Sequence, residues 1–317
     1  VAQAISDGVA AARAKGAVGV VLASVVGGEG RHSEPQANGE AGGREVIPTF
    51  AFPEDLAPLL GPIGDYCDWL ARDLGRVGEP KGCDTEEALR IVTEALSQRG
   101  EGWLTVAEAR AVLDAVGINL NAGRVVVSAA EARAAADGIG YPVAVTVAST
   151  GIVHKSDVGG VHLNLATADE VAKAYQAVSS LTEGTDARLD GALVGAMEDG
   201  IELFLGVDRD ASFGPLIGFG LGGTSVEVLD DVAFRLAPLT DRDAHDQVRS
   251  IRGWKLLAGH RGAPPVDAEA IEDLLARISA LVVAVDGIAE LDINPFFARP
   301  DGVVATDVRI LIKEPGR

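Results

Sequence analysis

The sequence has few of the residues that mark several large classes of protein. Its 317 residues include two cysteines, Cys67 and Cys83, too few for a disulfide framework or a four-cysteine metal site. A membrane-spanning helix needs about 20 apolar residues in a row, and no apolar run in the sequence approaches that length. The N-terminus also lacks the basic and then apolar pattern of a secretion signal. These absences predict a protein of the cytoplasm with no membrane partner.

Basic residues and methionine are also scarce. Lysine and arginine number 27 against 47 acidic residues, which gives a formal net charge of -20 and a pI near 4.6. A large basic surface for nucleic acid or anionic lipid is therefore not expected, and any bound phosphate must be held by local contacts. The one methionine is Met197, so we expect that the chain has lost its start or belongs to something longer.

The first part of the chain alternates helix and strand. Residues 4–15 and 53–72 predict helices, and the apolar runs 18–25 and 46–52 predict strands. The order is that of two β-α steps of a parallel sheet. Because two strands are too few for a parallel sheet with both faces covered, we expect the missing strands upstream of Val1.

From Trp103 onward, capping boxes predict where helices begin. In a capping box, a hydroxyl and a glutamate three residues later accept hydrogen bonds from two backbone N–H groups. The three boxes pair Thr105 with Glu108, Ser128 with Glu131, and Thr167 with Glu170. Strand-like runs fall between and after these helices, at residues 141–149, 160–165, 192–197, 201–207, 215–219, 289–293 and 303–308. The fold class is therefore α/β with mixed sheets. We predict one domain over residues 1–74, a linker with a helix over 75–102, and a second domain over 103–317.

A polar face is predicted on the strand near the C-terminus. Residues 289–294 alternate strictly, so Glu290, Asp292 and Asn294 share one face while Leu291 and Ile293 point into the core. Residues 299–302 form a turn signal and 303–308 return as a strand.

The register of this hairpin predicts a cation site. With a two-residue loop at Pro300 and Asp301, Asn294 faces Asp307, and their Cβ atoms lie about 5 Å apart. Asp292, Asn294 and Asp307 would then supply oxygen ligands of the kind Mg²⁺ takes together with nucleotide phosphates. The alternative is a solvated polar face, because Pro295 cannot donate to the ladder and a one-residue slip would separate the faces.

Two further segments are candidates for phosphate chemistry. Residues 218–225 are interpreted as a glycine-rich turn whose backbone N–H groups approach a phosphate, or simply as a tight turn. His154 lies between two strands beside Lys155, Asp157 and the pair Gly159-Gly160. Lys155 adds positive charge and Asp157 would orient the imidazole, so His154 is a candidate nucleophile or phosphoryl carrier; a structural or merely exposed histidine is the alternative.

Together these motifs resemble a known family. Residues 105–310 are similar to the ATP-grasp domain of NDP-forming acyl-CoA synthetases, the group that includes ADP-forming acetyl-CoA synthetase and is related to succinyl-CoA synthetase. The segments that carry the resemblance are 139–143, 154–161, 220–223 with 231–239, 250–253 and 290–295. Residues 1–72 resemble the end of the flavodoxin-like, succinyl-CoA-ligase-like domain that precedes the ATP-grasp domain in fused members. The resemblance therefore implies an ATP-grasp domain after a partial parallel α/β domain.

The resemblance also implies a reaction and its residues. Acyl-CoA, phosphate and ADP are interconverted with carboxylic acid, CoA and ATP through a phosphohistidine relay, with CoA bound by a domain upstream or on a partner subunit. His154 matches the second phosphoryl acceptor, with Asp157 beside it as the other catalytic candidate, and Asp292, Asn294 and Asp307 match the Mg²⁺ ligands. The nucleotide-binding positions predicted on this basis are Thr146, Gly159, Gly160, Val194, Met197, Glu202, Gly222 and Gly223. A homo-oligomer is a further expectation.

Two residues depart from the family pattern. Thr146 stands where the family carries a lysine that contacts nucleotide phosphate, so a charge-assisted contact is lost, and Gly195 stands where glutamine is frequent. The same architecture is found fused to an acetyltransferase domain in bacterial protein lysine acetyltransferases. A non-catalytic regulatory or ligand-sensing module is therefore the alternative function. A carboxylate-amine ligase is the third, but it leaves His154 without a role.

Overall fold

The computed structural model describes residues 2–17, 21, 23–24, 36–38, 44–50, 52, 54, 57–152, 155–181, 189–223 and 231–314. They fall into two units, Val1–Asp73 and Leu74–Arg317. Among these residues no helix has the length and apolar character needed to cross a membrane.

The first unit contains short elements around a small core. They are α1 (Ala2–Ala14), β1 (Ala23–Ser24), β2 (Gln36–Asn38), β3 (Arg44–Val46), β4 (Thr49–Phe50) and α2 (Ala57–Ala71). Strands β1 and β4 pair in parallel, with Ala23 opposite Thr49, which confirms the parallel pairing predicted from the two apolar runs. Most of the predicted strand 18–25 lies outside the described residues.

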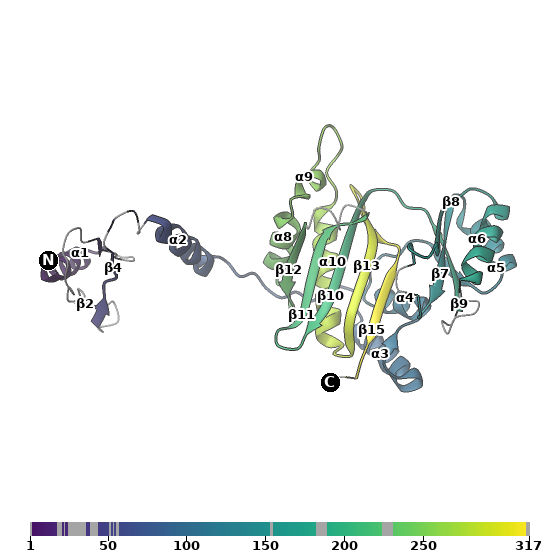
Figure 1. Cartoon of the computed structure of the whole chain (residues 1–317), viewed down its shortest axis with the longest axis horizontal. Coiled ribbons are helices and arrows are strands. Elements are labelled where there is room, and N and C mark those ends of the chain that lie inside the picture. Colours follow the sequence, from purple (N-terminus) through teal and green to yellow (C-terminus); the bar gives the residue numbers. More distant parts are fainter. Residues whose placement is uncertain are drawn as a thin grey trace. The chain divides into compact units, whose positions relative to one another are not determined.

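The second unit is built on two sheets (Figure 1). The larger has the strand order β12-β11-β10-β13-β15-β5, with β14 paired to β13, and the smaller has the order β6-β9-β7-β8. Its helices are α3 (Thr85–Arg99), α4 (Val106–Ala115), α5 (Ala129–Ile139), α6 (Ala168–Ser180), α8 (Asp241–Ser250), α9 (Trp254–Leu257) and α10 (Ala268–Ala284). Its strands are β5 (Gly102–Trp103), β6 (Gly123–Val126), β7 (Val143–Ser149), β8 (Val161–Leu165), β9 (Leu189–Ala196), β10 (Ile201–Asp210), β11 (Gly214–Leu221), β12 (Val232–Leu236), β13 (Ile288–Arg299), β14 (Gly302–Ala305) and β15 (Val308–Ile312).

Each sheet has its own hydrophobic core. Strand β7 alternates, so Val143, Val145 and Val147 are fully buried and join the core that the small sheet shares with α5 and α6. The larger core includes residues of α3, α4, α8 and α10 and of the large sheet, among them Phe219 and Phe296. Period-two alternation in the strands thus leaves the opposite face of each sheet for other contacts.

The helix in the predicted linker 75–102 belongs to the second unit. Ala88, Val92 and Ala95 on one side of α3 are buried in the larger core. Their spacing of three and four residues is that of a helix face packed on a neighbour. The helix predicted within the linker 75–102 therefore packs in the larger core of the second unit.

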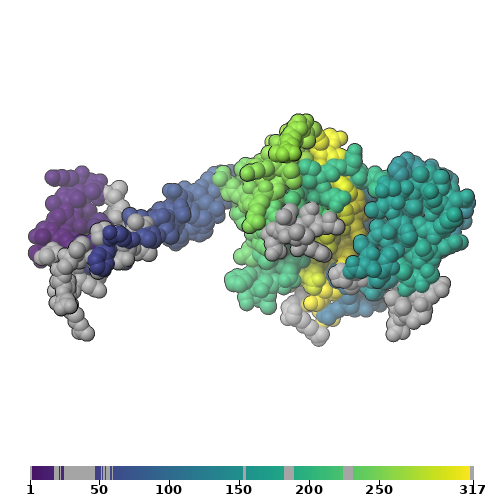
Figure 2. Space-filling model, turned by 45° about the horizontal axis from the view of Figure 1, so that its top comes forward, coloured from purple at the N-terminus to yellow at the C-terminus, as the bar shows by residue number. Residues whose placement is uncertain are grey.

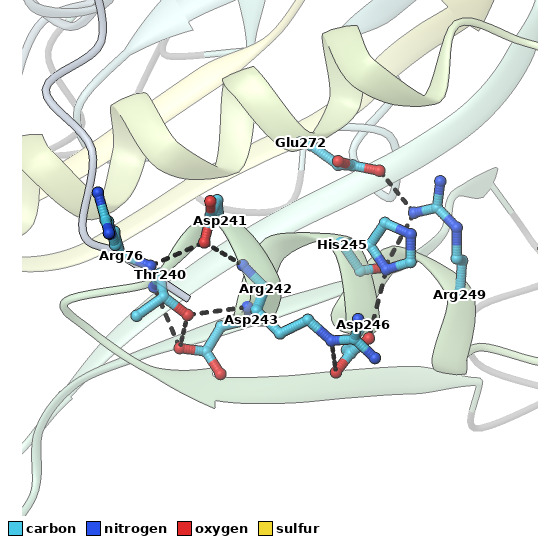
Figure 3. A network of polar contacts seen from close by, with 9 residues as sticks. All are labelled: Arg76, Thr240, Asp241, Arg242, Asp243, His245, Asp246, Arg249 and Glu272. Carbon is cyan, nitrogen blue, oxygen red and sulfur yellow. Dashed lines mark hydrogen bonds and ion pairs between the residues drawn. The ribbon is translucent and has the colours of Figure 1, made fainter. Parts of the chain in front are cut away.

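The segment before Thr85 is fixed to the start of α8 (Figure 3). The Asp241 carboxylate accepts hydrogen bonds from the backbone N–H groups of Arg76 and Arg242, each at 2.8 Å, and the Asp241 N–H donates to the Arg76 carbonyl at 2.9 Å. These backbone hydrogen bonds, that from Arg76 foremost, lower the pKa of Asp241. Gly75 has φ +71°, and a Cβ there would lie 2.2 Å from Asp241 Oδ1, so the close approach requires glycine.

The predicted helix caps are largely confirmed. Complete capping boxes are present at Thr105 and Thr167. Ser128 accepts from the Glu131 N–H, but the Glu131 carboxylate accepts from Val127. The capping box at the start of α8, between Thr240 and Asp243, was not predicted; aspartate there replaces the glutamate of the usual signature.

Candidate functional site

The hairpin of β13 with β14 and β15 has the predicted register. Arg299 pairs with Gly302 and Phe296 with Ala305, and the same offset holds for Ile293 with Val308. The Asn294 N–H donates to the Asp307 carbonyl at 3.2 Å. Asn294 therefore stands opposite Asp307, as predicted.

The return segment 303–308 is interrupted, contrary to the prediction of one strand. Strand β14 ends at Ala305 and β15 begins at Val308, so Thr306 and Asp307 lie between them. The cause is Pro295, which has no N–H for the ladder, and its carbonyl accepts from the Thr306 hydroxyl at 2.8 Å. Asp307 is thereby placed at a break in the strand.

The polar face is also as predicted. Leu291 and Ile293 are 1% and 0% exposed and lie in the larger core, whereas Asp292 is partly buried and Asn294 is exposed on the other face. Burial raises the pKa of Asp292, and the negative charge of Asp307 raises it further, against the attraction of Arg309 and Lys155. Two carboxylates that interact in this way favour a bound cation.

Lys155 is joined to this face by an ion pair that sequence reasoning missed. Its side chain is 7% exposed, and its Nζ lies 2.7 and 2.8 Å from the two carboxylate oxygens of Asp307. The two residues are 152 positions apart, on segments next to different sheets, so no local pattern predicts the pair. In Figure 2 the yellow C-terminal residues lie between the green and the teal residues of this unit.

The turn that carries Lys155 is held against β7 by Gly160. The Gly160 N–H donates to the Lys155 carbonyl at 2.7 Å, and the Gly160 carbonyl accepts from Val147 at 2.8 Å. A Cβ at Gly160 would lie 2.6 Å from Val147 Cγ1. Gly159 has φ +71° and Asp157 is exposed, while His154 lies outside the described residues. The observed contacts of Gly160 thus fix the backbone of Lys155.

A second group of predicted residues meets at the end of β11. The Gly222 N–H donates to the Glu202 carbonyl at 2.7 Å, and a Cβ at Gly223 would lie 2.6 Å from Glu202 Oε2. The interpretation of 218–225 as a turn is wrong in its first half, because β11 continues to Leu221. Gly218 and Gly220 lie in that strand, where bulkier residues would meet phenylalanine rings of neighbouring strands.

The remaining predicted nucleotide positions differ in access. Thr146 is half-buried on β7, between Leu193 of β9 and Val161 of β8. Val194 is fully buried in the small-sheet core, so its side chain is not available to a ligand. Met197 is partly exposed just after β9.

The space beside Gly195 is occupied by the side chain of Asn121. A Cβ there would lie 3.0 Å from Nδ2 of Asn121, which is 6% exposed and donates to the Ala196 carbonyl at 3.0 Å. Arg110 donates to the Asn121 carbonyl at 2.6 Å and to the Thr306 carbonyl at 3.5 Å. Asn121 therefore fills the space beside Gly195 and links the small sheet to the segment that carries Asp307.

A small cavity touches Lys155, and a larger one lies beside it. The small one, of about 20 Å³, is lined by residues that include Trp103, Thr150, Lys155 and Arg309. The larger one, of about 360 Å³, shares Trp103 and Thr150 with it. The Arg309 guanidinium lies 4.3 Å from the centre of the Trp103 ring, a cation–π contact.

Asp292, Asn294 and Asp307 supply part of the ligand shell of a hard divalent cation. Within the described residues no cluster of three histidine, cysteine, aspartate or glutamate side chains is present. Asp292, Asp307 and Asn294 offer two carboxylates and one amide on adjoining positions. An octahedral Mg²⁺ shell completes such a set with water and phosphate oxygens, so the residues fit a metal that arrives with a nucleotide.

Comparison with known proteins decides the family. Residues 95–312 match the ATP-grasp domain family. The chain is 40% identical over 233 residues to the β subunit of ADP-forming acetate–CoA ligase II of Pyrococcus furiosus, a match that covers 72% of this chain and 98% of that subunit. The chain belongs to the ATP-grasp family of ADP-forming acyl-CoA ligases. The resemblance inferred from the motifs and the α/β ATP-grasp fold are thereby confirmed.

Longer relatives and a solved structure agree with this assignment. The ADP-forming acetate–CoA ligase I of Archaeoglobus fulgidus is 39% identical over 271 residues, which are 84% of this chain and 39% of that protein. The chain thus spans about two fifths of that relative. The dinucleotide-forming acetyl-coenzyme A synthetase 1 of Ca. Korarchaeum cryptofilum, in complex with coenzyme A, Ca-AMPCP and HgCl⁺, matches with TM-score 0.67 and 39% identity over 71% of this chain and 99% of that one.

Proposed function

We propose that this chain is the nucleotide-binding part of an NDP-forming acyl-CoA synthetase. It would interconvert acyl-CoA, phosphate and ADP with carboxylic acid, CoA and ATP. The observation that carries the proposal is the face formed by Asp292, Asn294 and Asp307 in a domain of the ADP-forming ligase family. The acid and CoA would be handled by a CoA-binding domain upstream in the same protein or on a partner subunit.

The residues have distinct roles in this proposal. Asp292, Asn294 and Asp307 would hold Mg²⁺, which when bound shields the phosphate charges during transfer. Glu202, Gly222 and Gly223, which contact one another, would lie at the nucleotide, together with Thr146 and Met197. Gly159 and Gly160 would shape the turn beside it.

His154 is proposed as the phosphoryl acceptor. The Nε2 or Nδ1 lone pair attacks the γ-phosphorus of ATP, a P–N bond forms, and the bond to the β-phosphate oxygen breaks to release ADP. Asp157, an exposed residue three positions further along the chain, would orient the imidazole. The phosphoryl group would then pass to the upstream domain.

Phosphorylation of the chain by ATP tests this role. Incubation with Mg²⁺ and ATP should place an acid-labile phosphate on His154, visible as a modified peptide by mass spectrometry. His154→Ala should abolish it, whereas His260→Ala, at an exposed histidine in a loop, should not. Thioester formation from acid, CoA and ATP after addition of a CoA-binding domain completes the test. No labelling of the wild-type chain, with no thioester formed, would contradict the proposal.

The alternative is a non-catalytic module beside an acetyltransferase domain. It is carried by Thr146, a neutral residue where a cation is expected on β7. The relatives are ligases, which supports catalysis over regulation. Absence of nucleotide binding at millimolar concentration would favour the module.

A further inference from the structure

Lys155 holds the same carboxylate that the proposed metal requires. Its Nζ contacts both carboxylate oxygens of Asp307, at 2.7 and 2.8 Å. The Asp307 backbone carbonyl is engaged separately, with the Asn294 N–H. A divalent ion bound to Asp307 therefore has to compete with Lys155.

The two cations repel one another when they share a carboxylate. At equal distance, a divalent ion repels an ammonium group twice as strongly as a monovalent ion does, and the repulsion grows as the surroundings become less polar. The side chain of Lys155 is 7% exposed, and a buried ammonium without a partner is costly. Metal binding at Asp307 therefore creates a need for a new anion beside Lys155.

The backbone of Lys155 is fixed while its side chain is long. Hydrogen bonds from Gly160 to the Lys155 carbonyl and from Val147 to Gly160 anchor the turn, and four methylene groups let the ammonium move about that anchor. The neighbouring carboxylate, Asp292, already faces a cation, because its partner in the ladder is Arg309. A phosphate oxygen of a metal-bound nucleotide, which the proposed function brings to this face, is an anion that can replace Asp307 beside Lys155.

We propose that Lys155 exchanges the Asp307 carboxylate for a phosphate oxygen of the nucleotide when a divalent cation binds. This inference rests on the proposed function. In this exchange Lys155 weakens the binding of the metal alone and strengthens the joint binding of metal and nucleotide. The metal would consequently bind more tightly when the nucleotide is present.

Opposite effects on two affinities test the exchange. The Lys155→Met variant of the full chain should bind Mn²⁺ alone at least about threefold more tightly, because a competing charge is removed. It should bind ADP in the presence of Mg²⁺ about tenfold more weakly, because a charged hydrogen bond to phosphate is lost. Electron paramagnetic resonance measures the first affinity and calorimetry the second. Lys173→Met, at an exposed lysine on α6, is the matched control.

Several results would overturn the exchange. If both affinities of Lys155→Met fell together, Lys155 would only position Asp307, and if neither changed, it would have no part in binding. A wild-type chain that binds Mn²⁺ but not ADP would contradict the proposed function as well as the phosphate contact. Tighter Mn²⁺ binding by Lys155→Met in that case would still support the competition for Asp307.

Amine labelling of the wild-type chain avoids a folding defect in the variant. With an N-hydroxysuccinimide ester of acetate, Lys155 should react slowly without ligand, several times faster with Mg²⁺ alone, and slowly again with Mg²⁺ and ADP. The Lys173 peptide should react at one rate throughout. A Lys155 rate that Mg²⁺ leaves unchanged would overturn the exchange.

Discussion

At the scale of single residues, Asp292 shows a conflict between stability and binding. Burial, and then the negative charge of Asp307, raise its pKa, so the folded protein binds this proton more tightly than the unfolded chain does. The free energy of unfolding therefore decreases as pH rises from about 4, the ordinary pKa of an aspartate, through the raised pKa of Asp292. Above the raised pKa the charged Asp292 remains unfavourable for stability. A residue retained at such a cost is expected to serve a ligand.

Asp292→Asn should accordingly stabilise the ligand-free chain at neutral pH and remove divalent cation binding. We expect a melting temperature about 1–3 °C above wild type at pH 8, with a smaller difference near pH 4, where both chains carry a neutral group. Thermal denaturation followed by circular dichroism at the two pH values measures this. A lower melting temperature for the variant at pH 8 would show that the charge stabilises the fold.

At the scale of elements, the turn that carries Lys155 depends on a glycine. In Gly160→Ala the new Cβ would lie 2.6 Å from Val147 Cγ1 and 2.9 Å from the Lys155 carbonyl oxygen. We expect a loss of about 1–3 kcal/mol in the free energy of unfolding, as for other overpacked sites, measured by urea denaturation.

The same substitution in α5 is the control. A Cβ added at Gly138 would have no other atom within 4 Å, so Gly138→Ala should stabilise the chain by up to about 1 kcal/mol through helix propensity. Equal effects at the two glycines would contradict the packing described for Gly160.

The segment before α3 gives a second prediction at this scale. Asp241→Asn weakens the acceptor for the Arg76 and Arg242 N–H groups, so trypsin should cut after Arg76 several times faster than in wild type. Because the pKa of Asp241 is lowered by these hydrogen bonds, protection should persist above the ordinary carboxyl pKa and be lost as pH falls through the lowered value. Asp65→Asn, on an exposed part of α2, should leave the cleavage rate unchanged.

Local patterns predicted those elements whose stability is decided locally. Capping residues at Thr105 and Thr167, strict alternation over 289–294 and a turn at 299–302 all act within a few residues, and the structure agrees with them. The Lys155–Asp307 pair and the Asn121 side chain beside Gly195 depend on how two sheets meet. Neither has a periodic signal, so neither was predicted from the sequence.

Distant contacts decide how two elements, β11 and α3, pack. Strand β11 extends through glycines that are typical of a turn, because phenylalanine side chains of adjacent strands occupy the space beside Gly218 and Gly220. Helix α3 lies in the segment predicted as a linker with a helix and has a largely polar sequence, yet Ala88, Val92 and Ala95 on one side of it are buried in the larger core. In both cases tertiary contacts override a local preference.

At the scale of the whole molecule, both cores of the second unit are made by residues 88–312. A chain that starts at Leu74 should therefore fold, melt within a few degrees of the full chain and keep its nucleotide affinity. Differential scanning calorimetry and nucleotide titration measure this. Aggregation of the shortened chain, or a melting temperature far below that of the full chain, would contradict the division into two units.

The proposed function rests on the claim that Asp292, Asn294 and Asp307 bind a metal and a nucleotide together. Calorimetric titration of the full chain with ADP, with and without Mg²⁺, tests it most directly. We expect binding that requires Mg²⁺ and is at least about tenfold weaker in Asp292→Asn, with Asp301→Asn, at an exposed residue of the hairpin turn, unchanged. Binding by Asp292→Asn equal to that of wild type, or none by wild type at millimolar ADP, would contradict the claim.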